Sequence, residues 1–180
     1  MPNPVEVAFG NTRVHVDEDT HSLYSIDAQH AQIHNGNVYT SCRIFESVAD
    51  NGNADMLLIT PADKTVFFSG YVEAAGDSYV YLYEAPTKSN NGTALSRINL
   101  NRQSANTAGT TAFYTPTVSD AGTEIRCKFL TGGSGGRAVG SSNQTYQEYI
   151  FNTSTAYLVR VTNKSGQART ISISSTWVEL

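Results

Sequence analysis

The chain has 180 residues, enough for one domain with its own core, so it needs neither a metal nor a disulfide framework to fold. Only 16% of the residues are charged and the net charge is -4, with the Lys and Arg residues scattered, which excludes the basic surface that binds nucleic acid. No run approaches the ~20 apolar residues of a membrane-spanning helix, and residues 1–11 lack the features of a secretory signal. We therefore expect that the protein is made in a cytoplasm and either stays there or leaves by a route that needs no signal, and we expect no membrane partner.

Residues 1–37 differ from the rest of the chain by their mixed polarity. They contain all four histidines and few strand signals beyond residues 5–9 and 14–16. The pattern allows a short helix over residues 27–34. Two interpretations stay open: an N-terminal arm that gains order against a neighbour, or ordinary integration into the sheet.

From residue 38 onward, segments rich in β-branched and aromatic residues alternate with turn sequences such as Asn91-Gly92. The predicted strands are residues 37–45, 54–60, 65–73, 78–84, 93–99, 111–114, 123–130, 146–151, 156–162 and 170–179. Short, regularly spaced strands predict an all-β fold, an antiparallel β-sandwich that is jelly-roll-like, with residues 38–180 as one domain. Two polar stretches, residues 101–109 and 131–143, are predicted loops.

The strand predicted at residues 78–84 gives the first indication of function. Side chains alternate faces along a strand, so Tyr79, Tyr81 and Tyr83 share one face and two aliphatic residues share the other. We expect the aliphatic face to pack against a second sheet, and the tyrosine face against a loop of the same subunit, another subunit or a ligand. These tyrosines, together with Trp177, are the candidate interface.

The two cysteines lie on predicted strands. Cys42 shares a face with Ile44, and Cys127 shares one with Phe129, so we expect both thiols to point into the core. Buried free thiols are favoured over a disulfide or a catalytic thiol, because a cytoplasm disfavours bridging and no His is near in sequence. An immunoglobulin domain is disfavoured, because Ile125 stands where its Tyr before the second Cys would be.

Motifs for metal binding or catalysis are incomplete. His30 and His34 have the i, i+4 spacing of two ligands on one helix face, but no third ligand is evident apart from Asp27. The acidic cluster at residues 17–19 lacks the alternating ligands and the Gly of a calcium loop. A glycosidase pair would have to come from the glutamates on predicted strands, namely Glu46, Glu73, Glu84, Glu124 and Glu148. We predict no catalytic residue, no metal and no cofactor, and thus no enzyme.

Several short stretches occur in succession along residues 38–180: Tyr83-Glu84-Ala85-Pro86-Thr87, Gly92-Thr93, Asn99-Leu100-Asn101-Arg102, Tyr114-Thr115-Pro116, Gly122-Thr123-Glu124-Ile125, Asn152-Thr153, Tyr157-Leu158-Val159, Asn163-Lys164-Ser165 and Trp177-Val178-Glu179. In this succession the chain resembles small virion structural proteins of tailed bacteriophages, of the head decoration or minor capsid type. The resemblance implies a β-sandwich or jelly-roll subunit, often a homotrimer, made in the host cytoplasm and placed on the capsid surface of the virion. Its partner would be the major capsid protein, and the resemblance assigns no site.

A carbohydrate-binding module, or a receptor-binding domain of a phage tail or fibre, is the alternative from another class. Such modules are β-sandwiches with few charges, and their exposed aromatic rings stack on sugars. The two functions differ in whether Tyr79, Tyr81, Tyr83 or Trp177 form an exposed aromatic platform on the single subunit or are covered by neighbouring subunits.

Overall fold

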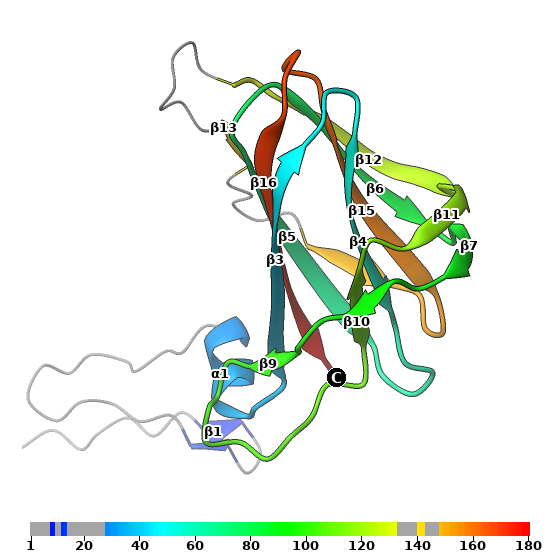
Figure 1. The fold of residues 1–180 in the computed structure, drawn as a ribbon. Helices are drawn as coiled ribbons and strands as arrows, with labels where there is room; N and C mark the ends of the chain where they lie inside the picture. Colours follow the sequence, from blue (N-terminus) through cyan, green and yellow to red (C-terminus); the bar gives the residue numbers. More distant parts are fainter. Residues whose placement is uncertain (1–7, 10–11, 14–27, 133–139, 143–147) are drawn as a thin grey trace, which may run out of the picture.

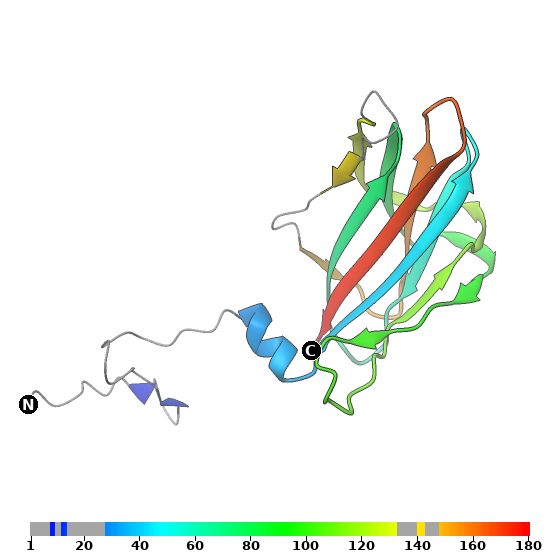
Figure 2. The ribbon, with the colours of Figure 1, turned by 60° about the vertical axis from the view of Figure 1, so that its left-hand side comes forward.

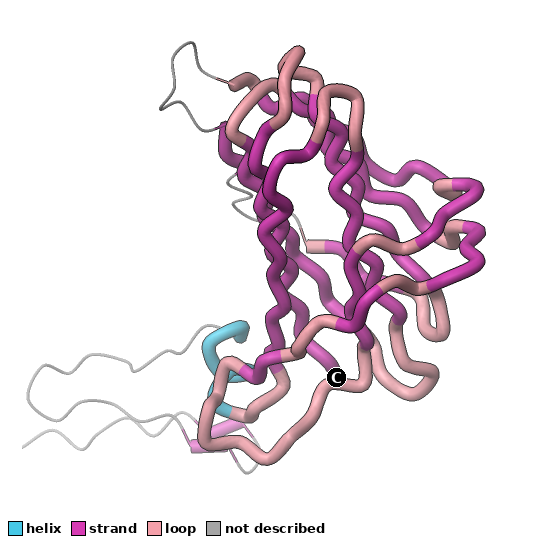
Figure 3. Tube along the Cα trace, viewed as in Figure 1, coloured by secondary structure: helices cyan, strands magenta, loops and turns pink. Residues whose placement is uncertain are grey.

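The alternating segments fold into two antiparallel sheets packed face to face in the computed structural model, which describes residues 8–9, 12–13, 28–132, 140–142 and 148–180 (Figures 1 and 3). In spatial order, the first sheet contains β12 (Thr123–Leu130), β6 (Ser78–Glu84), β15 (Ala156–Asn163), β4 (Asn53–Ile59), β10 (Thr111–Tyr114) and β8 (Thr93–Ala94). The second contains β13 (Gly140–Ser142), β5 (Val66–Ala74), β16 (Arg169–Glu179), β3 (Val38–Val48) and β9 (Ile98–Asn99), with β14 (Tyr149–Phe151) also paired to β5. Two small ladders join β7 (Thr87–Asn90) to β11 (Thr117–Asp120) and β1 (Ala8–Phe9) to β2 (Thr12–Arg13), and α1 spans Ala28–His34.

The predicted all-β sandwich is confirmed, while the jelly-roll connectivity stays a prediction. Strands β6, β10 and β12 have the bounds expected from the sequence, and the short helix is present as α1. Strands β7 and β11 were missed, because turn-forming residues make up half of each. The strand expected at residues 93–99 is divided into β8 and β9, and β13 lies within a predicted loop.

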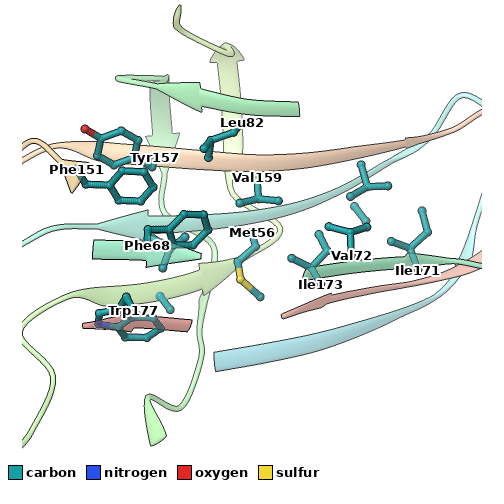
Figure 4. Packing of buried hydrophobic residues seen from close by; sticks show 14 of the residues in the cluster. Met56, Phe68, Val72, Leu82, Phe151, Tyr157, Val159, Ile171, Ile173 and Trp177 are labelled. Atoms are coloured by element: carbon teal, nitrogen blue, oxygen red, sulfur yellow. The ribbon is translucent and has the colours of Figure 1, made fainter. Parts of the chain in front are cut away.

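The core lies between the sheets and is built from the inward-facing residues of both (Figure 4). Within the core, the ring of Phe151 packs against Phe68 and Tyr157, with ring centroids 4.7 and 3.6 Å away. Met56 from the first sheet accepts a hydrogen bond from Ser175 of the second at 3.1 Å. Each large apolar side chain buried here contributes about 1.5–3 kcal/mol to stability.

The first sheet contains an internal repeat, formed by residues 83–95 and 113–125. Each copy reads Pro-Thr, then Ser, then Gly-Thr at matching positions. Each copy leaves the sheet after β6 or β10, passes through β7 or β11, and returns as β8 or β12. Each returning strand pairs with the first strand of the other copy, since β8 pairs with β10 and β12 with β6, while β7 pairs with β11. The copies therefore interlock about an approximate two-fold axis between β15 and β4.

Two glycines permit this interlocking. The backbone φ is +88° at Gly92 and +87° at Gly122, and a Cβ atom at either would lie 2.2 Å from a backbone carbonyl oxygen of the other copy. The two turns are closed in the same way, because the amide N–H of Gly92 donates to Asn90 at 2.7 Å and that of Gly122 donates to Asp120 at 2.9 Å. Only glycine combines this φ with so close an approach of two backbones.

The ladder of β7 and β11 lies on the outer side of the first sheet (Figures 1 and 2). Leu57 and Leu158 are direct cross-strand partners that point away from the main core, yet both are fully buried. Their burial is explained by the cover that β7 and β11 provide. The outer face of this sheet is thus covered at its centre and open at β6 and β12.

Candidate functional site

The open end of the first sheet carries a row of aromatic side chains. Tyr79, Tyr81 and Tyr83 share the outer side of β6, and the aliphatic residues between them pack toward the core, as alternation predicted. On the edge strand β12, Phe129 pairs with Tyr79 and Cys127 pairs with Tyr81. Tyr79 is 40% exposed and Phe129 is 49% exposed. We call the surface formed by Tyr79, Tyr81, Tyr83, Phe129 and Cys127 the aromatic face.

The rings of the aromatic face pack on one another. Tyr81 and Tyr83 stack with centroids 5.5 Å apart and an interplanar angle of 25°, and Tyr79 lies 5.5 Å from Phe129 at 54°. Two rings this close cannot lie side by side in one plane, so they overlap in an offset or tilted arrangement. Much of each ring face is therefore used within the subunit, which leaves ring edges and hydroxyl groups for contacts with a partner.

Charged groups border the aromatic face. Arg160, which pairs with Tyr81 across the sheet, binds Asp55 through two hydrogen bonds of 2.8 and 2.7 Å. Burial, and then the negative charge of Glu124, raise the pKa of both Tyr81 and Tyr83. The hydroxyl group of Tyr81 therefore stays protonated at neutral pH and can both donate and accept hydrogen bonds.

The structure places Trp177 far from this surface in the fold. It lies on β16, the central strand of the second sheet, and only 1% of its surface is exposed. Its indole N–H donates to Glu179 at 2.9 Å. The prediction that Trp177 joins the tyrosines in an interface is therefore wrong for this subunit, because its side chain lies in the core between the two sheets.

Both cysteines are free, but both are exposed, so the prediction of buried thiols is wrong. Alternation correctly placed Cys42 with Ile44 and Cys127 with Phe129, but both pairs lie on outer faces of the sandwich. The pattern shows which residues share a face, and it cannot show which face meets the other sheet. A hydrogen bond with Glu124 raises the pKa of the Cys127 thiol.

Among the described residues, no group of three or more His, Cys, Asp and Glu side chains could hold a metal ion. His30 and His34 are exposed on α1, and their Nε2 atoms lie 2.9 Å apart. The acidic cluster at residues 17–19 lies outside the described residues.

The candidate carboxylates are dispersed. Glu84 accepts hydrogen bonds from Tyr157 at 2.6 Å and from Asn152 at 2.7 Å, on the inner side of β6. Glu124 lies next to the tyrosines, on the other side of the same sheet. Glu73, on the second sheet, accepts from the hydroxyl group of Tyr71 at 2.7 Å. Exposed Glu46 and Glu148 complete the set. Glu84 and Glu124 therefore cannot face one cleft as a glycosidase pair requires.

No family model matches the chain, and neither a curated protein nor a solved structure resembles it significantly. No helix within the described part of the chain is long and apolar enough to cross a membrane. The site is therefore interpreted from its own geometry.

A cluster of asparagine side chains, which the sequence analysis missed, binds the C-terminal end of α1. Side-chain amides of Asn99, Asn101 and Asn106 donate to the backbone carbonyls of residues 36, 34 and 35 at 2.9, 2.9 and 3.2 Å. These carbonyls at the helix C-terminus have no partner inside the helix, so the amides complete their hydrogen bonding. The sequence signal of this arrangement was three asparagines close together, with Asn99 at the end of a predicted strand and Asn101 and Asn106 in the predicted loop that follows it.

Proposed function

We propose that the chain is a non-enzymatic structural protein of a virion, of the head decoration type, and that it docks on neighbouring subunits through the aromatic face. One observation carries this proposal: the exposed rings of Tyr79 and Phe129, with the partly buried Tyr81 and Tyr83 beside them, form a cluster on β6 and β12, on a part of the first sheet's outer side that β7 and β11 leave open. Aromatic residues of this kind are enriched at protein interfaces, where tyrosine buries area and its hydroxyl group finds a partner at the rim.

The resemblance to tailed-phage proteins supports the finer part of the proposal. A homotrimer that contacts the major capsid protein would bury about 800 Å² per partner at each contact. Repeated around a symmetry axis, such contacts strengthen a capsid lattice against internal pressure without any chemical reaction.

The ring geometry favours a protein partner over a sugar. Sugar stacking needs flat ring faces turned toward solvent, whereas Tyr81 and Tyr83 stack on each other. Tyr79 has the Lys164 ammonium group 5.8 Å from its ring centroid. A carbohydrate-binding module remains the second candidate, because Tyr79 and Phe129 are substantially exposed.

The test measures the solution mass by light scattering and the binding to capsids of the encoding phage by co-sedimentation. We expect three times the chain mass of 19.5 kDa, and co-sedimentation that falls by about tenfold or more in Tyr79→Ser/Phe129→Ser. Ile44→Ser is the matched control, because Ile44 is also an exposed apolar residue but lies on the second sheet.

Two results would overturn the proposal. One is a wild-type monomer that ignores capsids, and the other is capsid binding that both variants retain. Binding to a glycan array that is lost in the Tyr79→Ser/Phe129→Ser variant would instead support the carbohydrate-binding function.

A further inference from the structure

The second half of β3 forms an open edge of the second sheet. On one side β3 pairs with β16 along its length, but on the other side it pairs only with β9, at Tyr39 and Thr40 (Figure 1). Among the described residues, no strand pairs with residues 42–46 on that side. An edge of this kind presents unpaired backbone N–H and C=O groups, with which a further strand can pair.

Alternation along β3 identifies which backbone groups face the open edge. The carbonyl of Val38 accepts a hydrogen bond from the residue that follows β9, at 2.9 Å, whereas the carbonyl of Asn37 accepts one from the last residue of β16, at 3.0 Å. The pairing with β16 is regular from Val38 to Ile44. The N–H and C=O groups of Cys42 and Ile44 therefore point away from β16, as those of Val38 do.

A groove runs beside this edge. It has a volume of about 690 Å³ and lies between β3 and Tyr114, the last residue of β10. Arg43 is exposed and Phe45 is half-buried, whereas Ile173 and Ile171, their partners on β16, are 0% exposed. The inner side of the sheet thus loses its cover next to β3, and a strand added at this edge would supply it.

The charge in the groove indicates the chemistry of the occupant. The Arg43 guanidinium group lies 4.2 Å from the ring centroid of Tyr114, and no carboxylate in the described part of the chain forms an ion pair with it. A residue directly opposite Arg43 on an added strand would have its Cα atom about 4.5 Å away, so a carboxylate there would reach the guanidinium group. The neighbouring residue on the same side would face the rings of Phe45 and Tyr114, which pack edge to face, so an apolar side chain fits there.

A second copy of the chain fits this edge poorly. Two β3 edges that pair about a two-fold axis through the backbone groups of Cys42 and Ile44 would place the two Arg43 side chains directly opposite or diagonal to each other. Like charges this close destabilise a strand pair. A segment of different sequence is therefore favoured.

We propose that the open edge of β3 binds an extended segment of a partner protein by antiparallel strand addition, and that this segment carries an acidic residue opposite Arg43 and an apolar residue opposite Phe45. Cys42 and Ile44 take part through their backbone groups, which supply affinity, and the two side chains in the groove supply specificity. This inference is independent of the proposed function, which concerns the aromatic face on the first sheet.

The probe is a synthetic peptide with blocked ends, Thr-Leu-Val-Glu-Val-Thr, titrated into the full-length protein labelled with nitrogen-15 and followed by NMR. In the antiparallel register its Glu lies opposite Arg43 and its Leu opposite Phe45. We expect the amide signals of Cys42 and Ile44 to shift, with a Kd at or below about 1 mM. If these two amides do not shift at about 5 mM peptide, the inference is overturned.

Two N-methylated forms of the peptide test whether its backbone pairs with β3. The N–H group of its first Val, which lies opposite Ile44, would donate to β3, whereas the N–H group of its Glu would point away. N-methylation of this Val should weaken binding by about tenfold or more, and N-methylation of the Glu should leave the Kd nearly unchanged. Equal effects of the two methyl groups would contradict strand addition.

Substitution of Arg43 tests the chemistry assigned to the partner. Arg43→Gln should weaken binding of the peptide several-fold, because it removes the cation that faces the Glu of the peptide. Arg102→Gln is the matched control and should leave the Kd unchanged, since Arg102 is also an exposed arginine but lies outside the groove. Both arginines are exposed, so neither substitution should unfold the sandwich.

Two further results would overturn the inference. One is an equal Kd of the wild type and Arg43→Gln for the peptide. The other is a shift of the Cys42 and Ile44 amide signals when the protein concentration is raised without peptide, which would identify a second copy of the chain as the occupant.

Discussion

Trp177 donates its indole N–H to Glu179 at 2.9 Å, and both residues are buried on β16. Glu179 is only 3% exposed, and its carboxylate also accepts hydrogen bonds from Lys64 at 3.0 Å and from the amides of Gly109 and Thr110, both at 2.8 Å. These donors come from three separate parts of the chain. One buried charge therefore joins the C-terminal strand to the loop that precedes β10.

The first prediction concerns the acid stability of this network. Burial alone would raise the pKa of Glu179, but the hydrogen bonds from Thr110, Gly109, Lys64 and Trp177 outweigh it and hold the pKa below its usual value. The folded state thus binds fewer protons than the unfolded state, and the stabilisation is present above the unfolded pKa of about 4.3 and lost as pH falls through the folded pKa.

Glu179→Gln should lower the free energy of unfolding at pH 7 by about 2–4 kcal/mol and should weaken its dependence on pH below about 4.5. Urea unfolding at several pH values measures both effects. Glu46→Gln, at an exposed position, is the control and should change stability by less than about 0.5 kcal/mol. If the unfolding free energies of Glu179→Gln and Glu46→Gln have the same pH dependence, Glu179 does not control the acid stability.

The second prediction concerns the glycines of the internal repeat. Gly92→Ala and Gly122→Ala each force a positive φ on a residue with a Cβ atom and push that atom into a carbonyl oxygen of the other copy. Each should cost about 3 kcal/mol or more, and the two costs should be similar because the contacts match. Gly166→Ala is the control, since its φ is +78° but nothing lies within 4 Å of the added Cβ, so we expect about 1 kcal/mol. If urea unfolding shows the same loss of unfolding free energy for all three variants, the interlocking of the two copies is contradicted.

The internal repeat also shows which part of the fold could not be predicted from the sequence. The Pro-Thr and Gly-Thr steps are visible in the sequence, but their meaning depends on pairing between β8 and β10 and between β12 and β6, which lie far apart along the chain. Alternation was sufficient to place Tyr79, Tyr81 and Tyr83 on one face, because that is a local property of one strand. It could not predict the outward direction of Cys42, because which side of a strand is buried is decided by the second sheet.

The third prediction concerns Tyr157, whose hydroxyl group donates to Glu84 at 2.6 Å. Burial, followed by the hydrogen bond to Glu84, raises the pKa of Tyr157 to about 12. Its folded pKa lies above the unfolded value of about 10, so this contribution to stability is present below pH 10 and is lost as pH rises toward 12.

Tyr157→Phe should therefore cost about 1–2 kcal/mol at pH 7, and the difference from the wild type should shrink as pH rises above about 10. Urea unfolding of the two proteins at matched pH values measures it. Tyr71→Phe removes a hydroxyl group that also bonds to a glutamate, but at an exposed position, so it is the control and should show little effect. If the difference in unfolding free energy between wild type and Tyr157→Phe stays constant from pH 7 to pH 12, the raised pKa of Tyr157 is refuted.

The last prediction concerns the two exposed thiols. Both Cys42 and Cys127 should react with a soluble disulfide reagent in the folded protein, because both are exposed and free. Cys127 should react more slowly at pH 7.5, since the hydrogen bond with Glu124 and its negative charge raise the thiol pKa and lower the fraction of reactive thiolate. Glu124→Gln should speed the reaction of Cys127 and leave that of Cys42 unchanged, with Cys42→Ser and Cys127→Ser used to assign the two rates. If Glu124→Gln leaves the reaction rate of Cys127 unchanged, the Glu124 carboxylate does not control the reactivity of this thiol. If neither cysteine reacts, the outer faces are covered in solution by other copies of the chain. The mass measured by light scattering should then exceed that of one chain.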